Sequence, residues 1–117
     1  MIAPHTINRG LVIIIPKQPF YDWENAVFPE DDFKTRTVTA VEHTSYLLEE
    51  YQLYDDPQKA LSNYWKFIFE DQLFGICTDD NEWPKKLTWK LFTEWFEFHF
   101  SSMVIDLENG MIVKEEY

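Results

Sequence analysis

The order of apolar and polar positions predicts strands in several parts of the chain. Residues 11–15 read Leu-Val-Ile-Ile-Ile and are closed by a proline, which is typical of a central strand covered on both sides or shielded by loops. Strand-favouring residues return over 37–48, where broken alternation indicates a bulge or two short strands near 42–44. A further strand is expected at 103–107.

Apolar residues at helical spacing predict three helices between those strands. A short helix is expected over 19–27. The clearest helix runs over 57–74, because Asp56 can cap the free backbone N–H groups and the proline after it needs no partner there. The third helix runs over 89–100 and is capped by Thr88.

The last part of the sequence contains the strongest short hairpin signal. Asn109 and Gly110 both tolerate positive φ, so a return strand is expected at 111–113. The order β-α-β-α-α-β-β predicts one α+β domain over 1–117, with a small, mainly antiparallel sheet and helices packed on one face. Residues 1–9 are expected to be extended or disordered.

The charge balance narrows the choice of partner. The chain has 21 acidic and 10 basic residues and a formal net charge of −11. Such a charge repels phosphate backbones and anionic membrane surfaces, so neither nucleic acid nor a membrane is expected as a partner. It suits a basic protein partner, although solubility alone also explains it.

Cysteine usage and motif content indicate a cytoplasmic protein without a familiar catalytic centre. Cys77 is the single cysteine, which excludes an internal disulfide and fits a reducing compartment. The early apolar run is too short for a signal peptide or a membrane span. The sequence has no metal-ligand spacing, glycine-rich phosphate loop or hydrolase elbow, so no cofactor or metal is expected and the common enzyme classes are disfavoured.

Two ionisable residues fall on the apolar faces of the expected helices. His99 lies between Phe92 and Trp95 on the helical wheel, so it is either a neutral core histidine or a general base that opens into a pocket. Asp71 should accept a hydrogen bond from an indole or a phenol. Antiparallel helices would place the two residues roughly 15 Å apart, so a catalytic pair is not expected.

An enzyme or a small-ligand binder would use polar residues near the expected strand ends. The ligand-binding candidates are Lys17, Asp22, Trp23, His43, His99 and Asp106. Such a site predicts that at least two of them meet within hydrogen-bond reach in a concave pocket. His43 and Asp106 would be neighbours if their strands pair.

The stretch CTDDNEWP, residues 77–84, packs three carboxylates, a thiol, an indole and a proline together. Adjacent acids point apart, so they do not form a calcium loop, and they suit a turn that bonds its own backbone. The tryptophan before the proline would then be a hydrophobic plug that pins the corner. The alternative is a recognition surface, whose partner-binding candidates are Asp79, Asp80, Glu82 and Trp83.

Four distinctive motifs cover most of the chain. They are PKQPFYDW (16–23), EHTSYLL (42–48), LFGICTDDNEWP (73–84) and TWKLFTEWFEFHFSSMVIDL (88–107). Taken together, they resemble a family of small, acidic, aromatic-rich bacterial proteins of unknown function. The resemblance implies no activity, cofactor or catalytic residue, and residues 1–9 and the tail after Leu107 lie outside it.

Three hypotheses for function follow from these patterns. The first is a non-catalytic protein–protein interaction module with an acidic surface and exposed aromatic residues, of which an immunity or inhibitor protein is one version. The alternative is an enzyme or a small-ligand-binding domain with a pocket at the strand ends. A homodimer is the third, in which the edge strand 111–113 pairs with a second copy.

Overall fold

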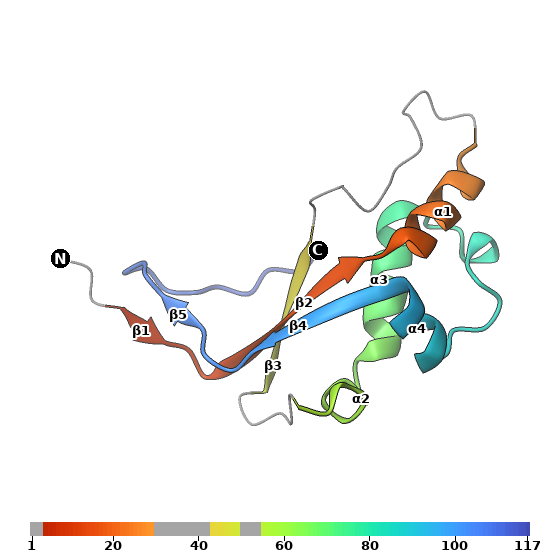
Figure 1. Ribbon diagram of the computed structural model, residues 1–117. Helices are drawn as coiled ribbons and strands as arrows, with labels where there is room; N and C mark the ends of the chain where they lie inside the picture. The colour runs from red at the N-terminus through yellow and green to blue at the C-terminus, as the bar shows by residue number, and fades with distance from the viewer. Residues whose placement is uncertain (1–3, 30–42, 50–54) are drawn as a thin grey trace.

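Helices and antiparallel sheets make up the protein, as the computed structural model in Figure 1 shows. The structure describes residues 4–29, 43–49 and 55–117. The predicted α+β class with antiparallel pairing is confirmed. No helix within the described ranges combines the length and the apolar character that crossing a bilayer requires.

The main sheet has three antiparallel strands in the order β3-β2-β4. The central strand is β2 (Arg9–Pro16), between β3 (Thr44–Glu49) and β4 (Phe96–Ser101). Val12 and Ile14 are fully buried, whereas the residues that alternate with them, Leu11, Ile13 and Ile15, are only half-buried. The prediction of a central strand is therefore confirmed, but helices cover only one of its faces completely.

Other strand predictions have mixed outcomes. Residues 37–42 lie outside the described residues, so the expected bulge near 42–44 falls at the edge of the described part, where β3 begins at Thr44. A second, two-stranded sheet joins β1 (His5–Thr6) to β5 (Ile105–Asp106), at the end of the molecule away from α1 and α4 (Figure 1). The expected strand at 103–107 is thus shorter than its apolar pattern predicted.

Two helices begin where the sequence predicts. Helix α1 (Gln18–Val27) has a proline in its first turn, where the missing N–H costs nothing. Helix α4 (Trp89–Trp95) is capped by Thr88, whose hydroxyl accepts a 3.1 Å hydrogen bond from the backbone N–H of Leu91.

The helix predicted over 57–74 is wrong as one continuous element. It divides into α2 (Pro57–Ala60) and α3 (Trp65–Ile76). Asp56 caps α2 as predicted, through a 3.3 Å bond from the backbone N–H of Lys59. The hydroxyl of Ser62 then donates to the carbonyl of Lys59 at 3.0 Å, a side-chain bond that competes with helical pairing and accompanies the break.

The prediction of a helix over 89–100 is also wrong, because the helix ends at Trp95 and the chain continues directly as β4. Phe96, Phe98 and Phe100 alternate with exposed residues, which is the period of a strand. Packing of these three rings against the core favours the extended backbone over the helix.

The hairpin predicted at Asn109 and Gly110 is not formed. Gly110 does not adopt positive φ, and residues 111–113 form no strand. The strand before this turn, β5, pairs instead with β1, which comes from the start of the chain. A homodimer through an edge strand at 111–113 therefore loses its structural basis.

The core lies between the covered face of the sheet and helices α1, α3 and α4. Phe69 of α3 contacts Phe92 of α4, with ring centroids 5.7 Å apart, and Phe92 stacks on Phe98 of β4, also at 5.7 Å. Aromatic pairs of this kind add to the stabilisation from burial. This packing buries one side of α3. The opposite side of the helix faces away from the core and carries exposed side chains.

Candidate acidic aromatic groove

An open groove follows the outward side of α3. Phe67, Glu70, Asp71 and Phe74 occupy positions i, i+3, i+4 and i+7 of this helix, so they share one face. Phe67 is 61% exposed and Phe74 is 56% exposed. Two large apolar rings with this exposure on one helix face form an apolar surface that the protein itself leaves uncovered.

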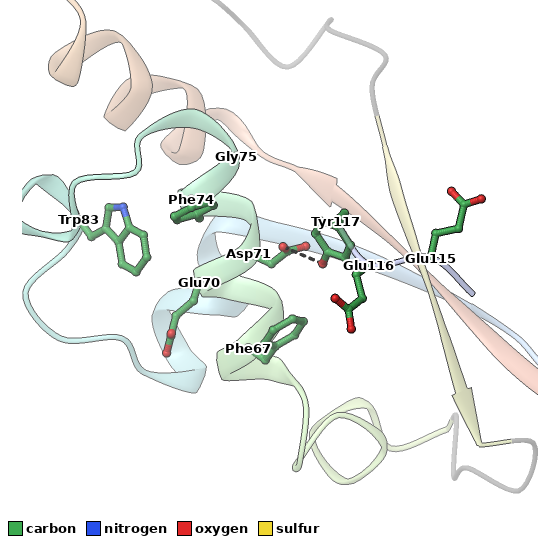
Figure 2. A pocket seen from close by; sticks show the side chains of 9 residues that line it. All are labelled: Phe67, Glu70, Asp71, Phe74, Gly75, Trp83, Glu115, Glu116 and Tyr117. Carbon is green, nitrogen blue, oxygen red and sulfur yellow. Dashed lines mark hydrogen bonds between the residues drawn. The ribbon is translucent and has the colours of Figure 1, made fainter. Parts of the chain in front are cut away.

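Two other segments complete the groove, whose volume is about 750 Å³. Trp83 comes from the corner that follows α3, and Glu115, Glu116 and Tyr117 come from the last residues of the sequence. Figure 2 shows Trp83 to one side of α3, level with Phe74, and Tyr117 beside Asp71. The groove is therefore assembled from parts of the chain that are distant in sequence.

All the charged side chains that line the groove are acidic. Its carboxylates are those of Glu70, Asp71, Glu115 and Glu116, and no lysine or arginine is among the nine described residues that line it. Together with the aromatic rings, these carboxylates create an environment that attracts cations and repels anions.

Asp71 holds both of its carboxylate oxygens in hydrogen bonds. Tyr46 of β3 donates to Oδ2 at 2.6 Å, and Tyr117 donates to Oδ1 at 3.0 Å. The amide of Gln72 donates in turn to the hydroxyl of Tyr46 at 3.0 Å. The expectation that a phenol would satisfy Asp71 is confirmed.

The two phenols stay protonated at neutral pH in this arrangement. Burial, and then the hydrogen bond to Asp71, raise the pKa of Tyr46 above its usual range. The pKa of Tyr117 is raised chiefly by its hydrogen bond to Asp71. Asp71 therefore acts as an acceptor for two neutral donors.

The CTDDNEWP stretch is a structural corner. Asp79 caps the short 3-10 helix η1 (Asp80–Glu82), because its carboxylate accepts a 3.0 Å bond from the backbone N–H of Asn81. The indole of Trp83 donates to the carbonyl of Cys77 at 2.8 Å, and its ring packs against the core. Trp83 thus pins the corner as predicted and also forms one wall of the groove.

The other partner-binding candidates lie on the same corner. Asp80 and Glu82 are exposed on η1, and the backbone carbonyl of Glu82 accepts a 2.9 Å bond from the indole of Trp23. Of the four predicted partner-binding residues, only Trp83 lines the groove.

Three of the six ligand-binding candidates lie around α1. Lys17 donates to the carbonyl of Thr93 at 3.1 Å, in the last turn of α4. Asp22 is exposed and accepts a 3.0 Å bond from the amide of Gln18, one helical turn earlier. The ring of Trp23 packs 6.1 Å from that of Trp95. These contacts hold α1 in place.

The remaining three candidates lie on different strands or at their ends. His99 was expected on an apolar helix face, but it is exposed on β4, opposite Ile13, because this part of the chain is a strand. The strands of His43 and Asp106 do not pair, and His5 is the residue opposite Asp106. No hydrogen bond joins any two of the six candidates, and none of them lines the groove.

Phe67 and Phe74 were not identified from the sequence as surface residues. The available signal was the spacing of the two phenylalanines, which lie about 20° apart on a helical wheel, with Glu70 and Asp71 each within about 60° of both rings. The contribution of residues 115–117 had no local signal, because it depends on where the chain returns to α3.

Within 4–29, 43–49 and 55–117, no three or more histidine, cysteine, aspartate or glutamate residues are grouped so that they could hold a metal ion. The carboxylates of the groove are accordingly interpreted as a charged surface.

Comparisons with protein-family models, with curated proteins and with solved structures find no match to this chain. The resemblance to a family of small, acidic bacterial proteins therefore stays a prediction, and the groove along α3 supplies the basis for a functional proposal.

Proposed function

We propose that this protein is a non-catalytic protein–protein interaction module whose groove along α3 binds a basic, partly apolar segment of another protein. The observation that carries the proposal is the combination of Phe67, Phe74 and Trp83 with four carboxylates in one open groove. Aromatic surface and fixed negative charge in one place suit a partner that presents both apolar and cationic side chains.

Charge complementarity favours arginine or lysine on that partner. The four groove carboxylates belong to a chain whose formal net charge is −11, so the long-range field and the local contacts act in the same direction. A guanidinium can bond a carboxylate and stack on an aromatic ring at once, which makes arginine the better fit. Nucleic acid is disfavoured as a partner because its phosphates would meet only like charge here.

A site for small-molecule chemistry has less support. Lys17 and Trp23 are engaged in contacts that fix α1, and His99 lies exposed on the far side of β4 from the core. The proposal includes a cytoplasmic location, supported by the lone Cys77, whose thiol donates only a weak 3.7 Å bond to the carbonyl of Asp79.

The test is fluorescence anisotropy with a labelled synthetic helical peptide that carries leucine on one face and arginine beside it. The reference peptide has every arginine replaced by glutamate. We expect the arginine peptide to bind the protein, to weaken as salt is raised, and to bind more tightly than the glutamate peptide.

Variants then locate the binding surface. The double substitution Phe67→Ser and Phe74→Ser should weaken binding of the arginine peptide by about tenfold or more, since it removes the two exposed rings. The matched control is Leu47→Ser, on β3, where a side chain that is 51% exposed lies outside the groove. Equal affinity for both peptides, or equal loss in the control, would contradict the proposal.

A further inference from the structure

The last residues of the sequence return to α3 and line its groove. Residues 111–117 form no helix or strand, and all of them are exposed. Tyr117 is 99% exposed, yet its hydroxyl donates to Oδ1 of Asp71 at 3.0 Å. Figure 2 shows this bond at the side of the groove, with Glu116 next to it. Among residues 4–29, 43–49 and 55–117, this bond is the polar side-chain contact that fastens the exposed segment to α3.

Asp71 is oriented from the other side. Its Oδ2 is fixed by the short bond from Tyr46, and Tyr46 is itself held by the amide of Gln72. Because β3 and α3 set the direction of this carboxylate, its Oδ1 is the oxygen that is available to a donor in the groove. In the structure that donor is the hydroxyl of Tyr117.

We infer that residues 111–117 are an internal strap, and that the Tyr117 hydroxyl occupies the position at which a cationic side chain of the partner binds Asp71. This inference rests on the proposed function and adds to it a regulation of the same groove. Binding of the partner would exchange the phenol for a guanidinium or an ammonium group at Oδ1 of Asp71 and release the Tyr117 hydroxyl from that carboxylate.

The exchange is favourable for a cation and unfavourable for a neutral donor. A cation adds Coulomb attraction to the carboxylate that a neutral phenol lacks, and a guanidinium can bond a carboxylate through two parallel N–H groups. A neutral serine or glutamine of a wrong partner would only replace one neutral bond by another, with the cost of releasing the strap added. The strap thus makes the groove more selective for positive charge.

The same strap carries two of the groove carboxylates. Glu116 lies next to Tyr117 in Figure 2, whereas the side chain of Glu115 points away from Asp71, and both glutamates add negative charge to the lining of the groove. They draw a cation toward the place where Tyr117 is bound, so attraction and competition come from neighbouring residues. Substitutions can separate the two effects, because Tyr117→Phe removes the hydroxyl and leaves both glutamates in place.

The first measurement concerns the strap without any peptide. Backbone ¹⁵N relaxation should report residues 114–117 as restrained in the unmodified protein and as mobile in Tyr117→Phe. Val113→Ala is the matched control, since this side chain is 71% exposed in the same segment and should leave the restraint unchanged. Equal mobility in the unmodified protein and in Tyr117→Phe would overturn the strap.

The second measurement uses the arginine–leucine peptide. Tyr117→Phe should tighten its binding about two- to fivefold, because an exposed hydrogen bond contributes at the low end of the usual range. Val113→Ala should bind like the unmodified protein. Unchanged or weaker binding by Tyr117→Phe would overturn the inference and leave the proposed function standing. Failure of all three proteins to bind, with the strap still restrained, would overturn the proposed function and with it the competition.

Discussion

The hydroxyl of Tyr46 on β3 and the carboxylate of Asp71 on α3 are joined by a hydrogen bond of 2.6 Å. The contact crosses from an edge strand of the sheet to the helix that packs behind it, and it links residues 25 positions apart in sequence. It also sets the direction of the one groove carboxylate that both the sheet and the final segment contact. The bond between Tyr46 and Asp71 therefore contributes both to the packing of β3 against α3 and to the geometry of the proposed binding surface.

Substitution of Tyr46 by phenylalanine should lower the free energy of unfolding by about 1–2 kcal/mol, because Asp71 loses a partly buried donor and Gln72 loses its acceptor. Tyr117→Phe is the matched comparison, since it removes a phenol from the same carboxylate at an exposed position. It should leave the stability nearly unchanged. Urea denaturation of both variants measures the difference, and equal losses would contradict it.

Stability should fall as the pH rises above the ordinary pKa of tyrosine, about 10. The folded protein raises the pKa of Tyr46, so the unfolded chain loses this proton first and is favoured increasingly at higher pH. Below that pH the contribution is fully present. Denaturation midpoints from about pH 8 to pH 11 should decline, and Tyr46→Phe should decline less steeply. Parallel curves for the two proteins would show that Tyr46 is not the responsible group.

Two phenylalanines of α3, two positions apart, should respond very differently to truncation. Phe69 is fully buried against Phe92, so Phe69→Ala should cost about 3–5 kcal/mol. Phe67 is 61% exposed, so Phe67→Ala should change stability by less than about 0.5 kcal/mol. Thermal and chemical denaturation check both values. A large loss in Phe67→Ala would mean that this ring belongs to the core and not to the groove.

Adjacent aspartates of the corner should also differ. Asp79→Ala removes the carboxylate that caps η1 and should cost about 0.5–2 kcal/mol. Asp80→Ala, at the next and equally exposed position, serves as the control and should cost less. The measurement is again chemical denaturation. Equal effects would indicate that the Asp79 cap contributes little to the corner.

The parts of the fold with strong local chemistry could be predicted from the sequence. The β-branched run of β2 and the caps at Asp56 and Thr88 formed as expected, because each depends on residues a few positions apart. The strand β4 was misread because Phe92, Phe96 and Phe100 also repeat at helical spacing. The alternation of phenylalanines with polar residues over 96–101 fits a strand as well, and the pairing of β4 with β2 decides between the two readings.

The groove was predicted less well than the fold. Trp83 was predicted to pin the corner and, as the alternative, to bind a partner. Asp71 was predicted to accept a hydrogen bond from an indole or a phenol. That Tyr46 and Tyr117 would be the donors depends on contacts between residues 25 and 46 positions apart. Hydrophobic periodicity carries no information about such pairings, which arise only when the sheet, α3 and the final segment come together.

The direct passage from α4 into β4 has a consequence for variation in chain length. Trp95 is the last helical residue and Phe96 is the first residue of the strand, with no loop between them. One added amino acid at this junction would turn Phe96, Phe98 and Phe100 to the solvent side and bring Glu97 and His99 inward, because side chains alternate along a strand. Homologous chains should therefore tolerate insertions in many places, but not here.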